Sequence, residues 1–214
     1  MLAKNIVFDL DGTLIDSMPG IALSINLAIA EVCPERKATE VGHLIGPPLR
    51  EVFRRALLLE DNNVLTALEE AFRRSYDGGN WRQTRLYDGV TETLAKLRAT
   101  DCRLFIVTNK PPMPTERILR HFDLWTRFDE VVTILSRQPP FATKAAATDD
   151  LQRRHDLSAS HTVFVGDSAD DGAAAEACGF KFAAVTFGYG RAYRECDSPV
   201  HFRLERFEDL LNIL

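Results

Sequence analysis

Cysteine is scarce in this sequence and widely scattered. The four cysteines are Cys33, Cys102, Cys178 and Cys196, so none forms a CxxC pair. No histidine lies at the spacing of a zinc ligand, and the pattern therefore favours neither a disulfide framework nor a zinc module. This usage is typical of a reduced protein, and we expect a cytoplasmic location.

The sequence also lacks an excess of basic residues and any long hydrophobic run. Lys and Arg number 26 against 31 Asp and Glu, which gives a formal net charge of -5. That balance disfavours binding to nucleic acid or to an anionic membrane. No stretch approaches the ~18 apolar residues of a membrane span, and Lys4, Asp9 and Asp11 interrupt any N-terminal apolar run. We expect neither a nucleic-acid nor a membrane partner.

Short β-rich runs alternate with helical stretches along most of the chain. Strands are predicted at NIVFD, RLFIVTN, TVFVGD and KFAAVTFG, each ending on a polar residue. Helices are predicted from Gly89, from Pro114, from Ala142, in DDGAAAEACG and in the terminal RFEDLLNIL. This alternation, with 45% hydrophobic residues, favours an α/β fold with a Rossmann-like, doubly wound parallel sheet.

Residues 16–85 break this alternation, because they contain helical patterns and no convincing strand. Ser17 is the predicted N-cap of the first helix, with Pro19 in its first turn. The glycines and prolines of VGHLIGPPLR predict a shaped loop inside this segment. We therefore expect a core domain of residues 1–15 and 86–214, with a small helical domain of residues 16–85 inserted after the first strand.

Polar residues follow the predicted strands at their carboxyl ends, where open parallel sheets bind ligands. Asp9 and Asp11 repel one another when both are ionised, which indicates that a cation or a proton compensates them. Carboxylates and waters suit Mg²⁺, which leaves positions for phosphate oxygens. Thr108, a lysine, and the backbone N–H groups around Gly12 and Asn109 would face the phosphate.

Four motifs then carry a family resemblance. DLDGT after the first strand, TNK after a middle strand, Lys144 on a later helix and GDSADD after another strand resemble the haloacid dehalogenase-like superfamily, in the order that family uses. The helical insertion is similar to its C1-type cap. IGPPLREVF, LYDGV and FGYG resemble its phosphoglycolate phosphatase-type branch.

The resemblance implies a role for each motif residue. Asp9 would be the nucleophile that forms an aspartyl-phosphate, and Asp11 the general acid and base. Mg²⁺ would be held by Asp9, Asp167 and the Asp11 backbone carbonyl, with Asp171 orienting metal-bound water or the lysine. The remaining implied roles are phosphate binding by Thr108 and Asn109 and charge compensation by Lys144.

Several residues keep two interpretations. Lys110 is the rival of Lys144, because Lys144 lies in TKAAA rather than in the usual Lys-Pro setting. Asp170 adjoins Asp171, although the GDxxxD spacing selects Asp171. In the glycine-proline loop, His43 and Arg50 are substrate-contact candidates, but local packing and a solvated helix face explain them equally well.

The predicted function is Mg²⁺-dependent hydrolysis of a small phosphorylated metabolite, with phosphoglycolate favoured, by a monomer or homodimer. A 5'-nucleotidase and a phosphosugar mutase would share every core residue. A phosphonate hydrolase would need a lysine in the insertion, where Lys37 is available. A non-catalytic binding module would be expected to lose Asp9 or Asp11, and both are present.

Overall fold

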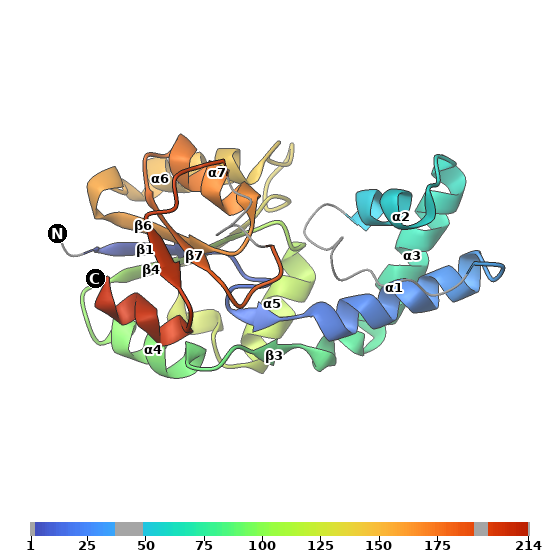
Figure 1. Cartoon of the computed structure of the whole chain (residues 1–214), viewed down its shortest axis with the longest axis horizontal. Helices are drawn as coiled ribbons and strands as arrows, with labels where there is room; N and C mark the ends of the chain where they lie inside the picture. The colour runs from blue at the N-terminus through green and yellow to red at the C-terminus, as the bar shows by residue number, and fades with distance from the viewer. Residues whose placement is uncertain (1–2, 37–48, 191–196, 214) are drawn as a thin grey trace. The chain divides into compact units, whose positions relative to one another are not determined.

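The computed structural model describes residues 3–36, 49–190 and 197–213. It divides into two compact units, residues 1–16 with 86–214 and residues 17–85 (Figure 1). The chain thus leaves the first unit after Asp16 and returns to it at Leu86. None of the helices among these described residues is long and apolar enough to cross a membrane.

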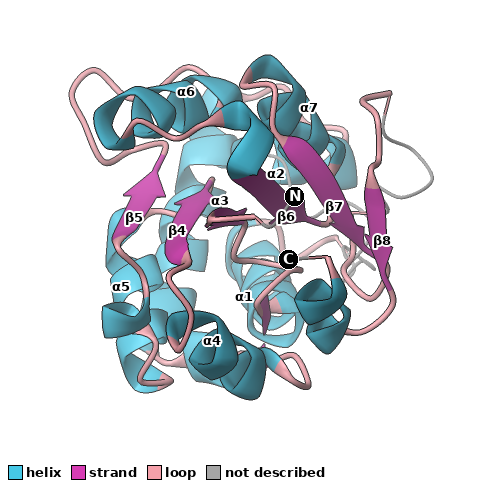
Figure 2. Cartoon of the chain, turned by 90° about the vertical axis from the view of Figure 1, so that its left-hand side faces the viewer, coloured by secondary structure: helices cyan, strands magenta, loops and turns pink. Residues whose placement is uncertain are grey.

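The larger unit contains a six-stranded sheet with the order β5-β4-β1-β6-β7-β8, in which every pair of neighbours is parallel. Helices α6 and α7 cover one face, while α4, α5 and the terminal segment cover the other (Figure 2). The strands are β1 (Asn5–Phe8), β4 (Arg103–Thr108), β5 (Glu130–Thr133), β6 (Thr162–Gly166), β7 (Lys181–Val185) and β8 (Phe202–Leu204). The helices are α4 (Val90–Arg98), α5 (Pro112–His121), α6 (Lys144–His155) and α7 (Ala169–Ala177), with short 3₁₀ helices at Trp125–Arg127 and Ala159–His161.

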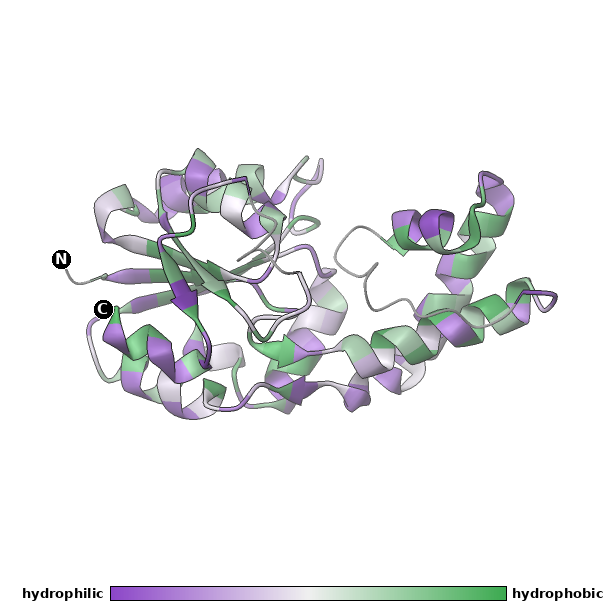
Figure 3. Cartoon of the chain, in the orientation of Figure 1, coloured by the Kyte–Doolittle hydropathy of each residue, from purple (hydrophilic) through white to green (hydrophobic). Residues whose placement is uncertain are grey.

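Both faces of the central strands are buried, which explains their continuous apolar runs. Val7 of β1 lies in the core cluster that includes residues of α6 and α7. Phe8 faces the other side and stacks on Phe207 of the terminal segment, with 5.9 Å between the ring centroids. Figure 3 shows the hydrophobic residues running along the strands and the helices alternating in hydropathy, as amphipathic elements do.

The strand order reverses at β1, because the chain moves from β1 to β4 and β5 and then returns to β6 on the other side. Phe8 at the end of β1 is in register with Ile106 of β4 and Val165 of β6. The carboxyl ends of these three strands therefore lie together at the topological switch point, where such sheets bind ligands.

The smaller unit is helical, with α1 packed against α3 around a core that includes Ile25, Ile29, Phe53 and Leu68. Its elements are α1 (Met18–Val32), α2 (Leu49–Leu57), α3 (Asn62–Gly78) and a 3₁₀ helix at Asn80–Gln83. A two-residue strand lies at each boundary, β2 (Ile15–Asp16) and β3 (Arg85–Leu86), and the two pair with each other.

Ser17 is the N-cap of α1, as predicted, although its side chain makes no capping hydrogen bond. Three other local predictions need correction. Helix α6 begins at Lys144 rather than Ala142, because Thr143 is its N-cap and accepts a hydrogen bond from the Ala146 N–H. Strands β5 and β8 were not predicted, since they are short and begin or end beside charged residues. The terminal RFEDLLNIL forms a 3₁₀ helix (Phe207–Asn212), whose i, i+3 geometry places Phe207 and Leu210 together in the core.

Candidate active site

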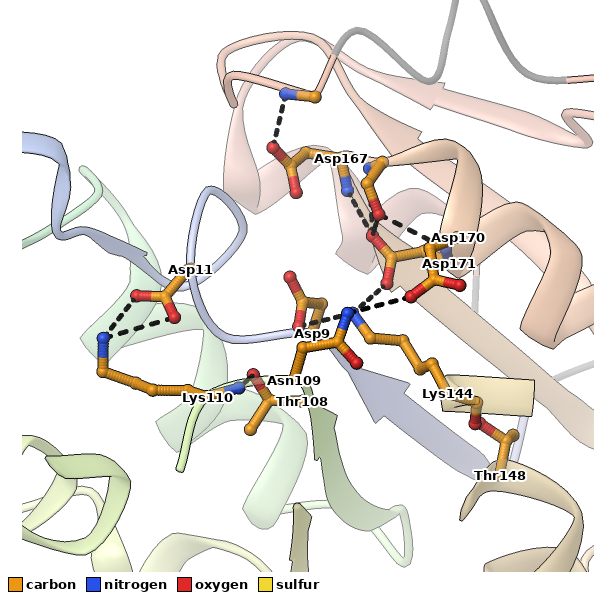
Figure 4. Close-up of polar contacts among 12 residues, drawn as sticks. Asp9, Asp11, Thr108, Asn109, Lys110, Lys144, Thr148, Asp167, Asp170 and Asp171 are labelled. Atoms are coloured by element: carbon orange, nitrogen blue, oxygen red, sulfur yellow. Dashed lines mark hydrogen bonds and ion pairs between the residues drawn. The ribbon is translucent and has the colours of Figure 1, made fainter. Parts of the chain in front are cut away.

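Buried polar side chains meet at the carboxyl ends of β1, β4 and β6. Asp9 directly follows β1, Thr108 ends β4 and Asp167 follows β6, and the three are 5%, 1% and 2% exposed. Figure 4 shows Asp9 and Asp171 beside Lys144, which projects from the first turn of α6. Buried ionisable groups require partners, so the pairing of each carboxylate defines the chemistry of the site.

Lys144 bridges two of these carboxylates. Its Nζ lies 2.9 Å from Asp9 Oδ1 and 2.6 Å from Asp171 Oδ1, and its side chain is only 3% exposed. Burial alone would lower the pKa of the Lys144 ammonium, but the charges of Asp171 and Asp9 raise it above its ordinary value. Lys144 is therefore a fixed positive charge beside Asp9.

Asp171 organises the turn that carries Asp167. One of its oxygens accepts hydrogen bonds from the Ser168 N–H (2.9 Å), the Ser168 hydroxyl (2.6 Å) and the Asp167 N–H (3.2 Å), while the other binds Lys144. Ser168 and Asp171 also form the capping box of α7. The adjacent Asp170 instead accepts from Asn109 Nδ2 at 2.9 Å, so the structure brings Asp171, rather than its neighbour, to Lys144.

Backbone groups from a distant loop hold Asp167. Its Oδ2 accepts from the N–H groups of Tyr189 (2.9 Å) and Gly190 (2.7 Å). A Cβ on Gly188 would lie 2.3 Å from the Gly12 carbonyl oxygen and 2.4 Å from Asp167 Cβ, so only glycine fits there. Gly12 itself has φ +87°, and a Cβ would collide with the Asp167 carboxylate. The absence of a side chain at Gly12 thus leaves space for the Asp167 carboxylate. This steric role is additional to the predicted role of the backbone N–H groups around Gly12.

The arrangement has an excess of negative charge. Burial, together with the charge of Asp171, raises the pKa of Asp167 from 3.8 to about 7. Burial also raises the pKa of Asp9 well above 3.8, an effect that Lys144 opposes and that Asp171 and Asp167 reinforce. Three carboxylates thus face one ammonium, and each offers an oxygen within 4.8 Å of the others. The donor set fits a hard divalent cation, with Asp9 and Asp167 as ligands because both oxygens of Asp171 already have partners.

Asp11 has a separate partner. Lys110 Nζ lies 3.0 Å from its Oδ1 and 3.3 Å from its Oδ2, and the Lys110 side chain is 5% exposed. Figure 4 shows the Asp11 carboxylate turned toward Lys110 and away from the cluster around Asp9. Within the described residues, the acidic cluster at metal-ligand spacing contains Asp9, Asp167 and Asp171, and leaves out the Asp11 side chain. The two candidate lysines therefore form ion pairs with different carboxylates: Lys110 with Asp11, and Lys144 with Asp9 and Asp171.

Thr108 and Asn109 line the same edge of the sheet and have local partners. The Thr108 hydroxyl accepts from the Lys110 N–H at 3.2 Å, which is a turn contact after β4. That hydroxyl also has a proton to donate. The Asn109 side-chain amide donates one hydrogen bond to the Asp170 carboxylate. Phosphate binding by these two residues stays a prediction.

The candidates from the helical insertion do not all have described positions. His43 and Lys37 lie outside the described residues, as does most of the predicted glycine-proline loop. Arg50 is described, and its guanidinium binds three groups of α3: Glu69 Oε2 (2.9 Å), Thr66 Oγ1 (2.8 Å) and Asn62 Oδ1 (3.2 Å). These contacts support the interpretation of Arg50 as a residue that joins α2 to α3, and its contact with substrate stays a prediction.

Sequence reasoning did not identify Ser168, Tyr189, Gly188 and Gly190 as parts of the site. The FGYG motif contributed only to the family resemblance, although two glycines around one aromatic residue are a signal for close backbone approach. Ser168 had a visible signal as well, since a serine three residues before an aspartate is the pattern of a capping box.

Comparisons with known proteins show which family this chain resembles. Residues 6–185 match the family model described as haloacid dehalogenase-like hydrolase. A phosphoglycolate phosphatase from Aliivibrio fischeri is 32% identical, and the alignment covers 99% of this chain and 96% of that protein. The crystal structure of a predicted phosphoglycolate phosphatase from Haemophilus somnus superposes with a TM-score of 0.86 at 30% identity, covering 99% of this chain and 97% of that one.

One further relative is named as a kinase rather than as a phosphatase. The tyrosine-protein kinase PtkA of Mycobacterium tuberculosis is 33% identical to this chain. The alignment covers 87% of this chain and 63% of that protein. The family match covers most of the chain, and the full-length similarity to the Aliivibrio phosphatase exceeds 30% identity. The chain therefore belongs to the haloacid dehalogenase-like hydrolases.

Proposed function

We propose that this protein is a Mg²⁺-dependent phosphatase that hydrolyses small phosphate monoesters through an aspartyl-phosphate on Asp9. The observation that carries the proposal is the position of Asp9: its carboxylate lies beside the buried Lys144 ammonium, at the edge of the sheet that Thr108 and Asn109 line. The phosphatase names of full-length relatives support the same reaction.

In the first half of the reaction, an Asp9 oxygen attacks phosphorus and the ester P–O bond breaks. The departing alkoxide takes a proton from the Asp11 carboxylic acid, and the alcohol leaves. Lys144 stays against Asp9 and compensates charge on the phosphoryl group, while Thr108 and Asn109 donate hydrogen bonds to its oxygens. Mg²⁺, when bound by Asp9 and Asp167, neutralises phosphate charge so that an anionic nucleophile can approach.

In the second half, water attacks the phosphorus of the aspartyl-phosphate. Asp11, now a carboxylate, takes a proton from that water, and the bond between phosphorus and Asp9 breaks. Inorganic phosphate leaves and both aspartates return to their starting states. A sugar hydroxyl in place of water would make the same site a mutase, so the acceptor in this step separates the two functions.

We favour phosphoglycolate as substrate, followed by a nucleoside monophosphate. The choice depends on the relatives' names, with 31–32% identity over nearly the whole chain for two phosphoglycolate phosphatases. A panel of phosphoglycolate, nucleoside monophosphates, phosphosugars and pyrophosphate, assayed for phosphate release with Mg²⁺, tests this order. Isomerisation stimulated by a bisphosphorylated sugar, without phosphate release, would replace the phosphatase with a mutase.

Asp9→Asn tests the nucleophile. The amide has nearly the shape of the carboxylate but is a poor nucleophile, so we expect the release of nitrophenol from p-nitrophenyl phosphate to fall at least about 10³-fold. The matched control is Asp101→Asn, an aspartate on the exposed turn before β4, which should keep wild-type turnover. Substantial activity in Asp9→Asn, with an unchanged melting temperature, would exclude Asp9 as nucleophile. Wild-type protein that releases no phosphate from any ester with Mg²⁺ would favour the binding-module alternative.

A further inference from the structure

The two aspartates of the DLDGT motif form ion pairs with different lysines. Lys144 Nζ contacts Asp9, and Lys110 Nζ contacts both oxygens of Asp11. The lysines come from different elements, Lys144 from the start of α6 and Lys110 from the turn after β4. Figure 4 shows them on opposite sides of Asp9. The proposed reaction gives Lys144 a role in charge compensation, but it leaves the buried Lys110 without one.

Lys110 is held in place by its surroundings. Its N–H donates to Thr108 Oγ1 at 3.2 Å, and its carbonyl oxygen accepts from the Thr115 hydroxyl at 3.4 Å. Pro111 follows it directly, which restricts the Lys110 backbone to extended conformations, and Pro112 begins α5. The side chain is 5% exposed, so its Nζ has little freedom to leave Asp11. The Lys110 ammonium therefore has a fixed position before any substrate binds.

Asp11, in contrast, lies in a loop between Asp9 and Gly12. Its side chain is 21% exposed, against 5% for that of Lys110, so the carboxylate is the less enclosed of the two partners. The Asp9 cluster has three carboxylates against one ammonium and therefore repels a further carboxylate, so the Lys110 ammonium supplies the attraction that fixes the orientation of the Asp11 carboxylate.

We propose that Lys110 is the positioning residue of Asp11: its ammonium contacts both carboxylate oxygens and fixes the orientation from which Asp11 transfers protons. The inference rests on the proposed function, because it presumes that Asp11 transfers protons. Lys110 acts through Asp11 and makes no contact with the phosphoryl group.

Lys110→Met removes the ammonium and keeps the length of the side chain. The departure of an alkyl alcohol needs a proton, whereas nitrophenolate hardly does, so the two substrates report on Asp11 to different extents. We expect kcat/KM for phosphoglycolate to fall at least about tenfold and that for p-nitrophenyl phosphate less than about threefold. Lys110→Gln should show the same contrast, and Lys110→Arg should restore part of the phosphoglycolate activity. Lys181→Met, on β7, is the matched control and should leave the ratio of the two kcat/KM values unchanged.

The decisive comparison uses Asp11→Asn as background. If Lys110 acts only through Asp11, adding Lys110→Met to Asp11→Asn changes kcat/KM by less than about twofold, because residues that act as a unit are not additive. The double variant also removes both partners of the ion pair, so neither charge is left alone if a single variant fails to fold.

The alternative outcomes separate the inference from the proposed function. Equal losses from Lys110→Met in the wild-type and Asp11→Asn backgrounds, or equal losses on both substrates, would overturn the positioning role and leave the phosphatase mechanism intact. Full activity of Asp11→Asn on phosphoglycolate would remove Asp11 from proton transfer, and the inference would fail with it.

Discussion

Asp167→Asn should make the metal-free protein more stable at pH 8. Asp167 is 2% exposed, and its negative charge is close to that of Asp171. Asparagine retains an amide oxygen that can accept from the Tyr189 and Gly190 N–H groups, so the substitution removes the charge and preserves these two hydrogen bonds. The variant therefore isolates the free-energy cost of the buried charge.

The sign and size of the effect follow from the pKa of Asp167. Its carboxyl has a pKa of about 7 in the folded protein and 3.8 when unperturbed, so between these values the folded state holds more protons than the unfolded state. Stability then falls as pH rises from about 4 to about 7. The pKa difference corresponds to at most about 4 kcal/mol at about 1.4 kcal/mol per pKa unit. Half of that energy would change the melting temperature by about 4–8 °C in a chain of this size.

Thermal unfolding with a metal chelator at pH 4 and at pH 8 measures this effect. Asp167→Asn should melt higher than wild type at pH 8, and the two should melt alike at pH 4, where both lack the charge. Mg²⁺ should then raise the melting temperature of the wild type at pH 8 and have little effect on Asp167→Asn, because the variant lacks a ligand. Asp101→Asn controls for loss of an exposed carboxylate and should behave as wild type.

Two results would refute this reasoning. An equal change in melting temperature at both pH values would mean that the effect of Asp167→Asn comes from packing rather than from charge. Equal stabilisation of wild type and Asp167→Asn by Mg²⁺ would place the cation elsewhere.

Two further substitutions test the surroundings of the site. Gly188→Ala should raise the Mg²⁺ concentration needed for activity and lower stability by about 1–3 kcal/mol, because its Cβ would lie 2.3 Å from the Gly12 carbonyl oxygen. Gly78→Ala, whose Cβ would meet nothing within 4 Å, is the control, and equal effects would contradict the steric argument. Arg50→Ala should lower the melting temperature and leave the kcat/KM ratio of phosphoglycolate to p-nitrophenyl phosphate unchanged, since the guanidinium binds α3. A ratio that falls would restore the predicted contact of Arg50 with a substrate carboxylate.

The sequence predicts the fold where local pattern and tertiary environment agree. The runs ending at Asp9, Asn109 and Asp167 are apolar because both faces of the sheet are covered, and the same burial makes them strands. Prediction fails where the environment decides. Strand β5 has four residues and begins with Glu130, so its pairing with β4 creates the strand, rather than its composition.

The candidate site divides in the same way. Carboxylates after strands are visible in a sequence, because topology brings strand ends together. Their partners are less visible: the donors to Asp167 are backbone N–H groups 22 and 23 residues away, and any residue could supply them. Arg50 illustrates the converse, since its position beside a loop suggested a ligand while its partner Glu69 lies on another helix.

Asp9 and Asp11 lie one residue apart, and two ionised carboxylates at this spacing repel each other. The structure separates them by charge: Lys144 holds one and Lys110, at 99 positions from its partner, holds the other. The two lysines supply two positive charges against the four carboxylates of Asp9, Asp11, Asp167 and Asp171. Two negative charges remain in the site, in the amount that one divalent cation would balance. The same pairing gives the two aspartates distinct environments, and distinct environments are what a nucleophile and a proton carrier require from identical side chains.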